Sequence, residues 1–279
     1  MYTKIIGITG STGFIGSNLL KELSKVHKVI VINLRDYADF DQLIYDLNKY
    51  KLTHFLNCVG GKSVGTSKLY PIEDFKSNVE SPTKILYALS KCKNKIHFTH
   101  ISSAGVYGEQ SISNIDNFTF SPYANHKKIY DDLLISTTTD NVDYLIVRPF
   151  SVYGPGLKKQ LIWDSYRKFT SEETPIFFGT GNELRNFIYI DDLCSIIRMH
   201  IEKDSTGIID VGSDEVKTIK EVLEIFVNVL GFNLDIKFNN TKDKGNPINL
   251  SEIQHKLKVP FNKYTSLLSG LKKYADWIK

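Results

Sequence analysis

Short runs of Val, Ile and Leu alternate with longer stretches of mixed polarity through the first half of the chain. The apolar runs predict strands over residues 4–9, 28–34, 54–59, 96–102 and 144–148. The stretches between them predict helices over residues 14–26, 42–51, 72–91 and 122–136, with Pro82 as a kink inside the third. Apolar strands separated by helices are typical of a parallel sheet covered on both faces. We therefore expect an α/β protein with a doubly wound parallel sheet.

This alternation changes after residue 148. The run 153–156 reads Tyr-Gly-Pro-Gly, a strong turn signal, and residues 157–187 do not fit a simple strand–helix unit. Further helices are predicted over 191–202 and 218–230. We expect a main domain of residues 1–153 plus about 188–210, and a smaller lobe of residues 154–187 and 211–279. The lobe should cover the carboxyl ends of the strands, where ligands of open α/β sheets bind.

Composition narrows the class of protein. Hydrophobic residues make up 42% and charged residues 24% of the 279 positions, which is ordinary for a globular enzyme. The net charge of +4 comes without a basic block, so nucleic-acid binding gains no support. We predict neither a signal peptide nor a membrane span. Cys58, Cys92 and Cys194 lack metal-binding spacing, so we expect reduced thiols, no metal and a cytoplasmic location.

A glycine-rich turn joins the first strand to the first helix. Its residues are Gly10, Ser11, Thr12, Gly13, Phe14, Ile15 and Gly16. A turn of this kind at a helix N-terminus is the usual way to hold a dinucleotide pyrophosphate. A tight turn without a ligand is the alternative.

The end of the second strand bears on the choice of cofactor. An acidic residue that would bind the adenosine ribose is expected there, but the position holds Asn33, and Arg35 follows. A missing carboxylate and a nearby guanidinium favour a 2′-phosphate. We expect NADP(H), with NAD(H) as the other option. The alternative for Arg35 is an ion pair with Asp36 or Asp39.

Tyr123 and Lys127 stand four positions apart on a predicted helix, which places both side chains on one face. A free Tyr has a pKa near 10, and a neighbouring ammonium lowers it, so the pair suits proton transfer. Ser103, just past a predicted strand, could donate a hydrogen bond to a substrate carbonyl. Taken singly, the Tyr could be a packed aromatic and the Lys a solvated helix residue.

Together these segments resemble the extended short-chain dehydrogenase/reductases, also called the nucleotide-sugar epimerase/dehydratase family. The resemblance covers nearly the whole chain. It includes the glycine turn, Ser103 with 104–108, Tyr123 with Lys127, 148–156, 179–181, 185–192 and 210–213. It implies a Rossmann domain with a small C-terminal lobe, and a homodimer formed through the helices at 72–91 and 122–136.

The resemblance also implies residue roles. Ser103, Tyr123 and Lys127 would be catalytic. Lys62 would contact cofactor and substrate, Pro149 the cofactor, Ser151 and Arg185 the substrate, and Asn78 would lie near the active site. Ser151 stands where the family often has Asn, and the alternative for Arg185, the expected diphosphate ligand, is an ion pair with Glu183 or Asp191. For a second phosphate-binding residue, only Lys242 and Lys244 lie near the expected place.

Three functions remain open. Sugar-nucleotide dehydratases of the family have an acidic pair after the catalytic Ser or Thr, whereas this chain has Ala104 and Gly105. Asn33 and Arg35 favour an NADPH-dependent 4-ketoreductase that acts on a nucleotide-linked deoxyhexose for surface polysaccharide such as the lipopolysaccharide O-antigen. The alternative is an NAD-dependent nucleotide-sugar 4-epimerase. A more remote alternative is a non-catalytic dinucleotide sensor.

Overall fold

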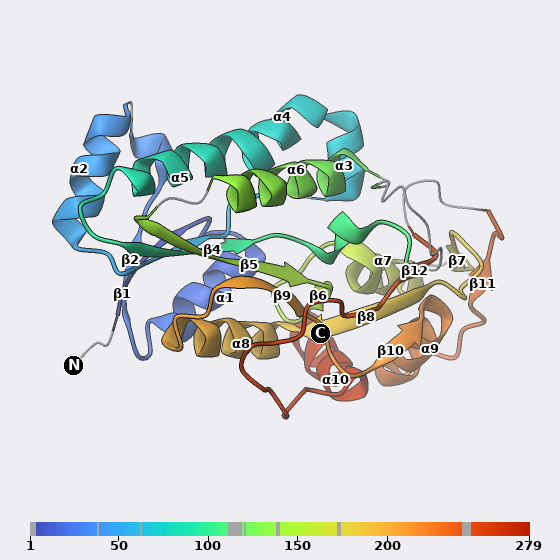
Figure 1. The fold of residues 1–279 in the computed structure, drawn as a ribbon. Helices are drawn as coiled ribbons and strands as arrows, with labels where there is room; N and C mark the ends of the chain where they lie inside the picture. The colour runs from blue at the N-terminus through green and yellow to red at the C-terminus, as the bar shows by residue number, and fades with distance from the viewer. Residues whose placement is uncertain are drawn as a thin grey trace.

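A six-stranded parallel sheet forms the centre of the protein (Figure 1). We describe it from a computed structural model, which covers residues 4–37, 39–61, 63–110, 119, 121–137, 140–171, 174–241 and 247–279. The strand order is β2-β1-β3-β4-β5-β9. The strands are β1 (Ile5–Thr9), β2 (Lys28–Val31), β3 (His54–Asn57), β4 (Ile96–Ile101), β5 (Val142–Pro149) and β9 (Gly207–Val211). The predicted α/β fold class is confirmed.

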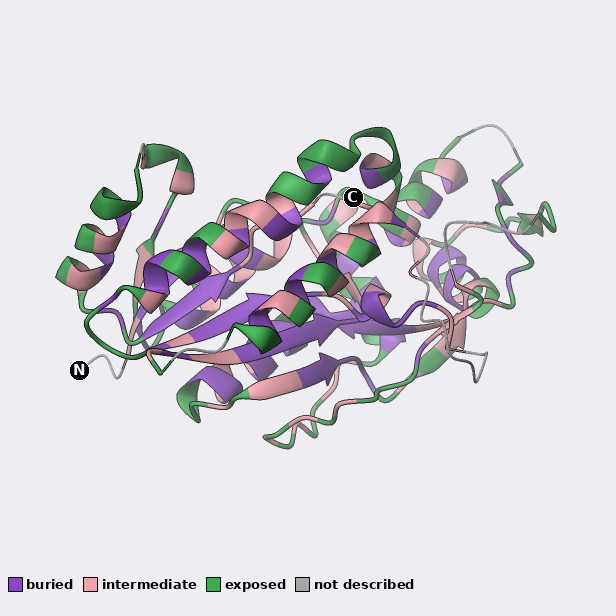
Figure 2. Cartoon of the chain, turned by 45° about the horizontal axis from the view of Figure 1, so that its top comes forward, coloured by how far each residue is buried: buried purple, intermediate pink, exposed green. Residues whose placement is uncertain are grey.

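Helices cover both faces of this sheet. In Figure 1, α2 (Phe40–Tyr50), α5 (Ser81–Ser90) and α6 (Pro122–Ser136) lie above it, and α1 (Phe14–Leu23) and α8 (Ile190–Glu202) lie below. Neighbouring strand residues serve opposite faces, because side chains alternate along a strand. Phe55 thus belongs to the core under α2 and α5, while Leu56 belongs to the core that includes α1 and α8. The central strands are buried along most of their length (Figure 2).

Smaller elements gather beyond the carboxyl ends of the central strands. A small sheet holds β6 (Ser151–Tyr153), β8 (Leu184–Tyr189), β10 (Val216–Thr218) and β12 (Asn249–Leu250), and a separate pair holds β7 (Ile176–Phe177) and β11 (Lys237–Phe238). The accompanying helices are α7 (Gln160–Phe169), α9 (Ile219–Leu230) and α10 (Leu267–Ile278). The exact domain boundaries stay a prediction.

The helix predicted over 72–91 forms without interruption, but a π-helical turn lies inside it. It consists of α4 (Pro71–Phe75), a π-helical turn (Lys76–Glu80) and α5, and it follows a separate α3 (Val64–Leu69) that the pattern did not predict. Pro82 lies in the first turn of α5, directly after the π-helical turn, where its missing amide hydrogen is tolerated. Within the described ranges, no helix is long and apolar enough to cross a membrane.

Candidate active site

The glycine turn lies at the carboxyl end of β1, and its shape depends on two glycines. Gly10 has a φ of 69°, and a Cβ there would lie 2.5 Å from the carbonyl carbon of Cys58. A Cβ on Gly16 would lie 2.1 Å from the carbonyl oxygen of Gly10. Side chains would therefore push the turn away from the strand behind it and from the helix that follows.

The residues at this turn fit a dinucleotide. Helix α1 begins at Phe14, and its N-cap residue is the exposed Gly13, which has no side chain to bond the first backbone amides. The first turn of α1 carries no acidic residue. The amides of the helix N-terminus are thus left to an anion. Asn33 and Arg35 follow β2, next to β1 in the sheet.

The side chains of Asn33 and Arg35 differ in their contacts. Asn33 accepts a hydrogen bond from the Arg35 amide at 3.4 Å and donates one to Asp36 Oδ1 at 2.9 Å. Arg35 is exposed, and among the described residues no carboxylate lies within 4.0 Å of its guanidinium. The ion pairs with Asp36 or Asp39 that we considered are therefore not formed.

Ser103 and Tyr123 meet beside the end of β4. Ser103 caps the 3₁₀ turn Ala104–Tyr107 by accepting a hydrogen bond from the Gly105 amide at 3.1 Å. Its hydroxyl is also hydrogen-bonded to the Tyr123 phenol. Helix α6 presents Tyr123 and Lys127 on one face, as the spacing predicted.

The expected lowering of the Tyr123 pKa is wrong for the protein without a cofactor. Burial raises the pKa of the phenol, the hydrogen bond with Ser103 opposes this, and the Asp74 and Asp131 carboxylates raise it further. Burial of the phenol is the largest of these effects, and the Lys127 ammonium points to another partner. Its Nζ donates to the carbonyl of Ile101 at 2.8 Å.

Lys127 is only 3% exposed. Burial lowers the pKa of its ammonium to about 8, although the Asp131 and Asp74 carboxylates both raise it. The side chain passes beside Gly60, where a Cβ would lie 2.9 Å from Nζ. The interior thus holds a lysine that is readily deprotonated, close to a phenol that is not.

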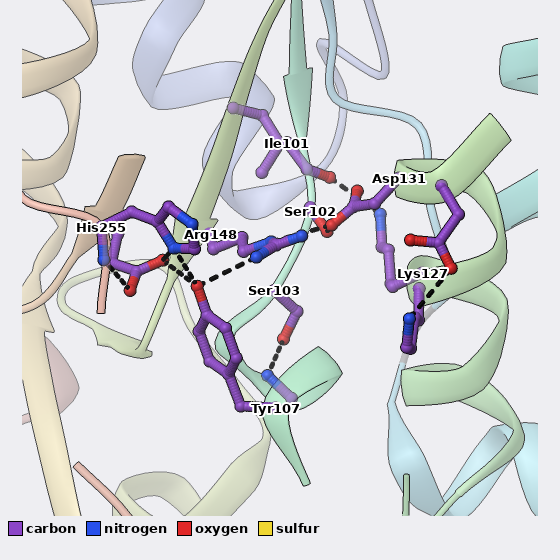
Figure 3. Close-up of polar contacts among 12 residues, drawn as sticks. Ile101, Ser102, Ser103, Tyr107, Lys127, Asp131, Arg148 and His255 are labelled. Carbon is purple, nitrogen blue, oxygen red and sulfur yellow. Dashed lines mark hydrogen bonds and ion pairs between the residues drawn. The ribbon is translucent and has the colours of Figure 1, made fainter. Parts of the chain in front are cut away.

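A chain of buried polar groups extends from this helix toward the C-terminal part of the protein (Figure 3). Asp131 Oδ2 accepts from Arg148 Nε and from Ser102 Oγ, both at 2.9 Å. The Arg148 guanidinium also donates to the Tyr107 hydroxyl at 3.0 Å. Asp131 is fully buried and Arg148 is 7% exposed, so each charge depends on the other.

The same chain continues past Tyr107. Its hydroxyl donates to Asp210 Oδ1 at 2.7 Å and lies 2.8 Å from His255 Nδ1. Asp210 Oδ2 accepts from the amides of Gln254 and His255. These bonds join the ends of β4, β5 and β9 to the segment that follows β12.

The remaining candidate residues that the structure describes lie at the same end of the sheet. Pro149 ends β5, and Ser151 begins β6. Arg185, on β8, bonds to the carbonyls of Leu184, Pro247 and Ile248. Asn78 is fully buried and accepts from the Gly61 amide at 2.9 Å. Lys62, Lys242 and Lys244 fall outside the described residues.

The sequence analysis did not identify Asp131 and Asp74, whose carboxylates raise the pKa of Lys127. Asp131 stands four residues after Lys127, and that helical spacing was a usable signal. Asp74 is brought in by α4 and bonds to His126 at 2.7 Å, a contact between distant segments. No local pattern marks it.

The sequence matches the NAD dependent epimerase/dehydratase family over residues 6–212. That match spans most of the chain, so the protein belongs to this family of nucleotide-sugar enzymes, and its fold is Rossmann-like.

Known proteins resemble it over their whole length. A putative UDP-glucose 4-epimerase of Methanocaldococcus jannaschii is 23% identical over 99% of this chain and 98% of its own. The UDP-N-acetylglucosamine 4-epimerase of Methanobrevibacter ruminantium has a TM-score of 0.84 at 23% identity, covering 100% of this chain and 99% of the other. The UDP-glucuronic acid 4-epimerase of Bacillus cereus, in complex with UDP-glucuronic acid and NAD, has a TM-score of 0.81 at 22% identity, covering 98% of each.

Gly16→Ala should abolish dinucleotide binding, because its Cβ would overlap the carbonyl oxygen of Gly10. Ser17→Ala is the control, since Ser17 is the next residue of α1, is exposed, and loses only a hydrogen bond to the Phe14 carbonyl. Fluorescence titration with NADH and NADPH measures both. Equal affinity in the two variants would show that the close approach at Gly16 is not required.

Arg148→Met should lower the free energy of unfolding by about 3 to 5 kcal/mol, because it leaves Asp131 buried without its hydrogen-bonded guanidinium. Adding Asp131→Leu should restore much of the loss. Arg198→Met is the control, since that arginine pairs with Glu22 and Glu202 near the surface and should contribute about 1 kcal/mol or less. Urea unfolding of the unaltered protein and the three variants gives the four free energies of unfolding. Similar losses for Arg148→Met and Arg198→Met would contradict the argument.

Lys127→Met should stabilise the cofactor-free protein most below pH 8, and this advantage should shrink as the pH rises toward 10.5. The folded-state pKa of Lys127 is about 8 against the ordinary 10.5, so burying its charge costs about 3 kcal/mol below pH 8. Above pH 8 the folded protein releases this proton first, and the penalty fades. Unfolding of both proteins at several pH values measures it, and a constant difference would mean that Lys127 titrates normally.

Proposed function

We propose that this protein is an NAD-dependent nucleotide-sugar 4-epimerase that acts on a UDP-linked hexose. The observation that carries the proposal is the cluster at the end of β4. There Ser103 is bonded to the Tyr123 phenol, Lys127 is buried one turn further along α6, and Ala104 and Gly105 supply no carboxylate. The cluster offers a proton acceptor for a sugar hydroxyl but no acid–base pair for elimination of water.

The similar proteins support the same reaction. The relative from Methanocaldococcus jannaschii is a putative UDP-glucose 4-epimerase, and the structures named above are UDP-sugar 4-epimerases, one of them with NAD. This support favours the epimerase over the ketoreductase that Asn33 and Arg35 suggest.

In the proposed mechanism, Tyr123 Oη removes the proton of the C4 hydroxyl and, once the keto sugar has rotated in the site, returns that proton to the C4 oxygen. The Ser103 hydroxyl donates a hydrogen bond to the C4 oxygen, and Lys127 would hold the nicotinamide ribose. Bound NAD would accept the C4 hydride and give it back to the opposite face of C4, which balances the two proton transfers, and its positive charge would favour the Tyr123 phenolate. Arg185 on β8 binds the diphosphate of the substrate.

One observation favours the ketoreductase as the second candidate. Arg35 is exposed at the end of β2 and forms no ion pair within the described part of the chain, so its guanidinium suits a 2′-phosphate. An enzyme of that kind would consume one NADPH for each keto sugar reduced, whereas an epimerase regenerates its cofactor in every cycle.

Tyr123→Phe should lower turnover of UDP-sugars by about 10²- to 10⁴-fold and leave NAD affinity nearly unchanged, because it removes only the proton-transfer group. Tyr45→Phe is the control, since Tyr45 is 62% exposed on α2. The assay follows interconversion of UDP-glucose and UDP-galactose, and of their N-acetyl and uronic acid forms, without added cofactor. Mass spectrometry identifies any nucleotide that copurifies. Full activity in Tyr123→Phe would remove Tyr123 from the mechanism, and stoichiometric NADPH oxidation by keto sugars without interconversion would establish the ketoreductase instead.

A further inference from the structure

A second polar cluster lies at the opposite ends of the central strands, away from Ser103 and Tyr123. His54 on β3, His97 on β4 and Asp143 on β5 are partners in the parallel ladder and therefore form a row across three strands. Asp204, in the turn after α8, faces this row. Its backbone has a φ of 49°, a conformation that Asp and Asn tolerate better than most residues. One ligand atom from each of His54, His97 and Asp204 lies within 4.8 Å of the others.

Two tautomers of His54 fit its neighbours, because the single Thr53 hydroxyl hydrogen is within reach of both the Ile5 carbonyl, at 3.1 Å, and His54 Nδ1, at 3.0 Å. In the tautomer with the hydrogen on Nδ1, Nε2 directs a lone pair at the cluster.

His54 Nε2 lies 2.9 Å from Asp204 Oδ1, and the Lys4 ammonium is bonded to Asp204 and lies 3.3 Å from the same Nε2. With the hydrogen on Nδ1, Nε2 and Oδ1 are both acceptors, and a cation between them satisfies both.

The spacing of the other groups also suits a metal ion. His97 Nε2 lies 4.0 Å from Asp204 Oδ1 and 3.7 Å from Asp143 Oδ2. Ligand atoms around a tetrahedral zinc ion lie about 3.3 Å apart, because each bond is about 2.0 Å long. The distances of 2.9 and 4.0 Å to Asp204 bracket that value. Two imidazoles with carboxylates favour zinc over magnesium or calcium, which prefer oxygen ligands.

We propose that His54, His97 and Asp204 bind a divalent cation of the zinc class, with Asp143 in the fourth position and the Lys4 ammonium displaced. Binding turns the His97 ring out of its stack with His54, where the ring centroids are 4.9 Å apart. His97 is accessible for this movement, since its side chain is 26% exposed. The ion joins β3, β4 and β5 to the end of α8, so its effect is on stability and not on the reaction.

The test uses the untagged full chain after removal of metals with a chelator. Calorimetric titration with zinc chloride should give one site per chain, and cobalt should give the visible absorption of a tetrahedral complex. Zinc at a hundredfold excess over its dissociation constant should raise the melting temperature by about 4 °C.

Variants locate the site. Asp204→Asn and His97→Ala should each weaken zinc binding at least tenfold, and Lys4→Met should strengthen it. Asn preserves the backbone conformation at 204, so that variant should fold even if His97→Ala does not. His255→Gln, a partly exposed histidine elsewhere, should bind zinc as the unaltered chain does.

Three outcomes would overturn the proposal. They are the absence of stoichiometric zinc binding to the unaltered chain, zinc binding that Asp204→Asn leaves unchanged, and zinc binding that occurs only in Lys4→Met. In the last case Lys4 is the permanent cation of this cluster.

Discussion

The buried ion pair between Asp131 and Arg148 is the interaction on which the rest of the site depends. Two charges removed from water are tolerated only when each satisfies the other, so α6 and β5 are held in one relative position. The same carboxylate supports the ammonium of Lys127, and the same guanidinium orients Tyr107. Helix α6 therefore presents its phenol and its lysine to the end of β4 from a fixed place.

Burial around that pair also affects the charge states of the two side chains on α6. Burial raises the pKa of the Tyr123 phenol, so it keeps its proton at neutral pH, whereas Lys127, with a pKa lowered to about 8, is still mostly charged there. Positive charge brought into the site would shift the balance toward the phenolate. The protein thus fixes the positions of Tyr123 and Lys127, and a positively charged ligand would lower the pKa of the phenol.

The two ends of the central sheet serve different purposes. At the carboxyl ends, a glycine turn, a helix N-terminus and polar side chains meet in the arrangement typical of ligand sites in parallel sheets. At the amino ends, His54, His97 and Asp204 form a compact polar cluster around the Lys4 ammonium. One sheet thereby separates a site for chemistry from a site for holding strands together.

The sequence by itself determined the features that depend on local spacing. Apolar runs and helical periods predicted the parallel sheet, α6 was predicted from Pro122 to Ser136 as observed, and the i,i+4 relation of Tyr123 to Lys127 followed from helix geometry. Only the tertiary structure decided which distant residues meet. The π-helical turn before Pro82, the direction of the Tyr123 pKa shift and the row of His54 with His97 all depend on strand register and burial. Those are set by packing of the whole chain, and no short stretch of sequence encodes them.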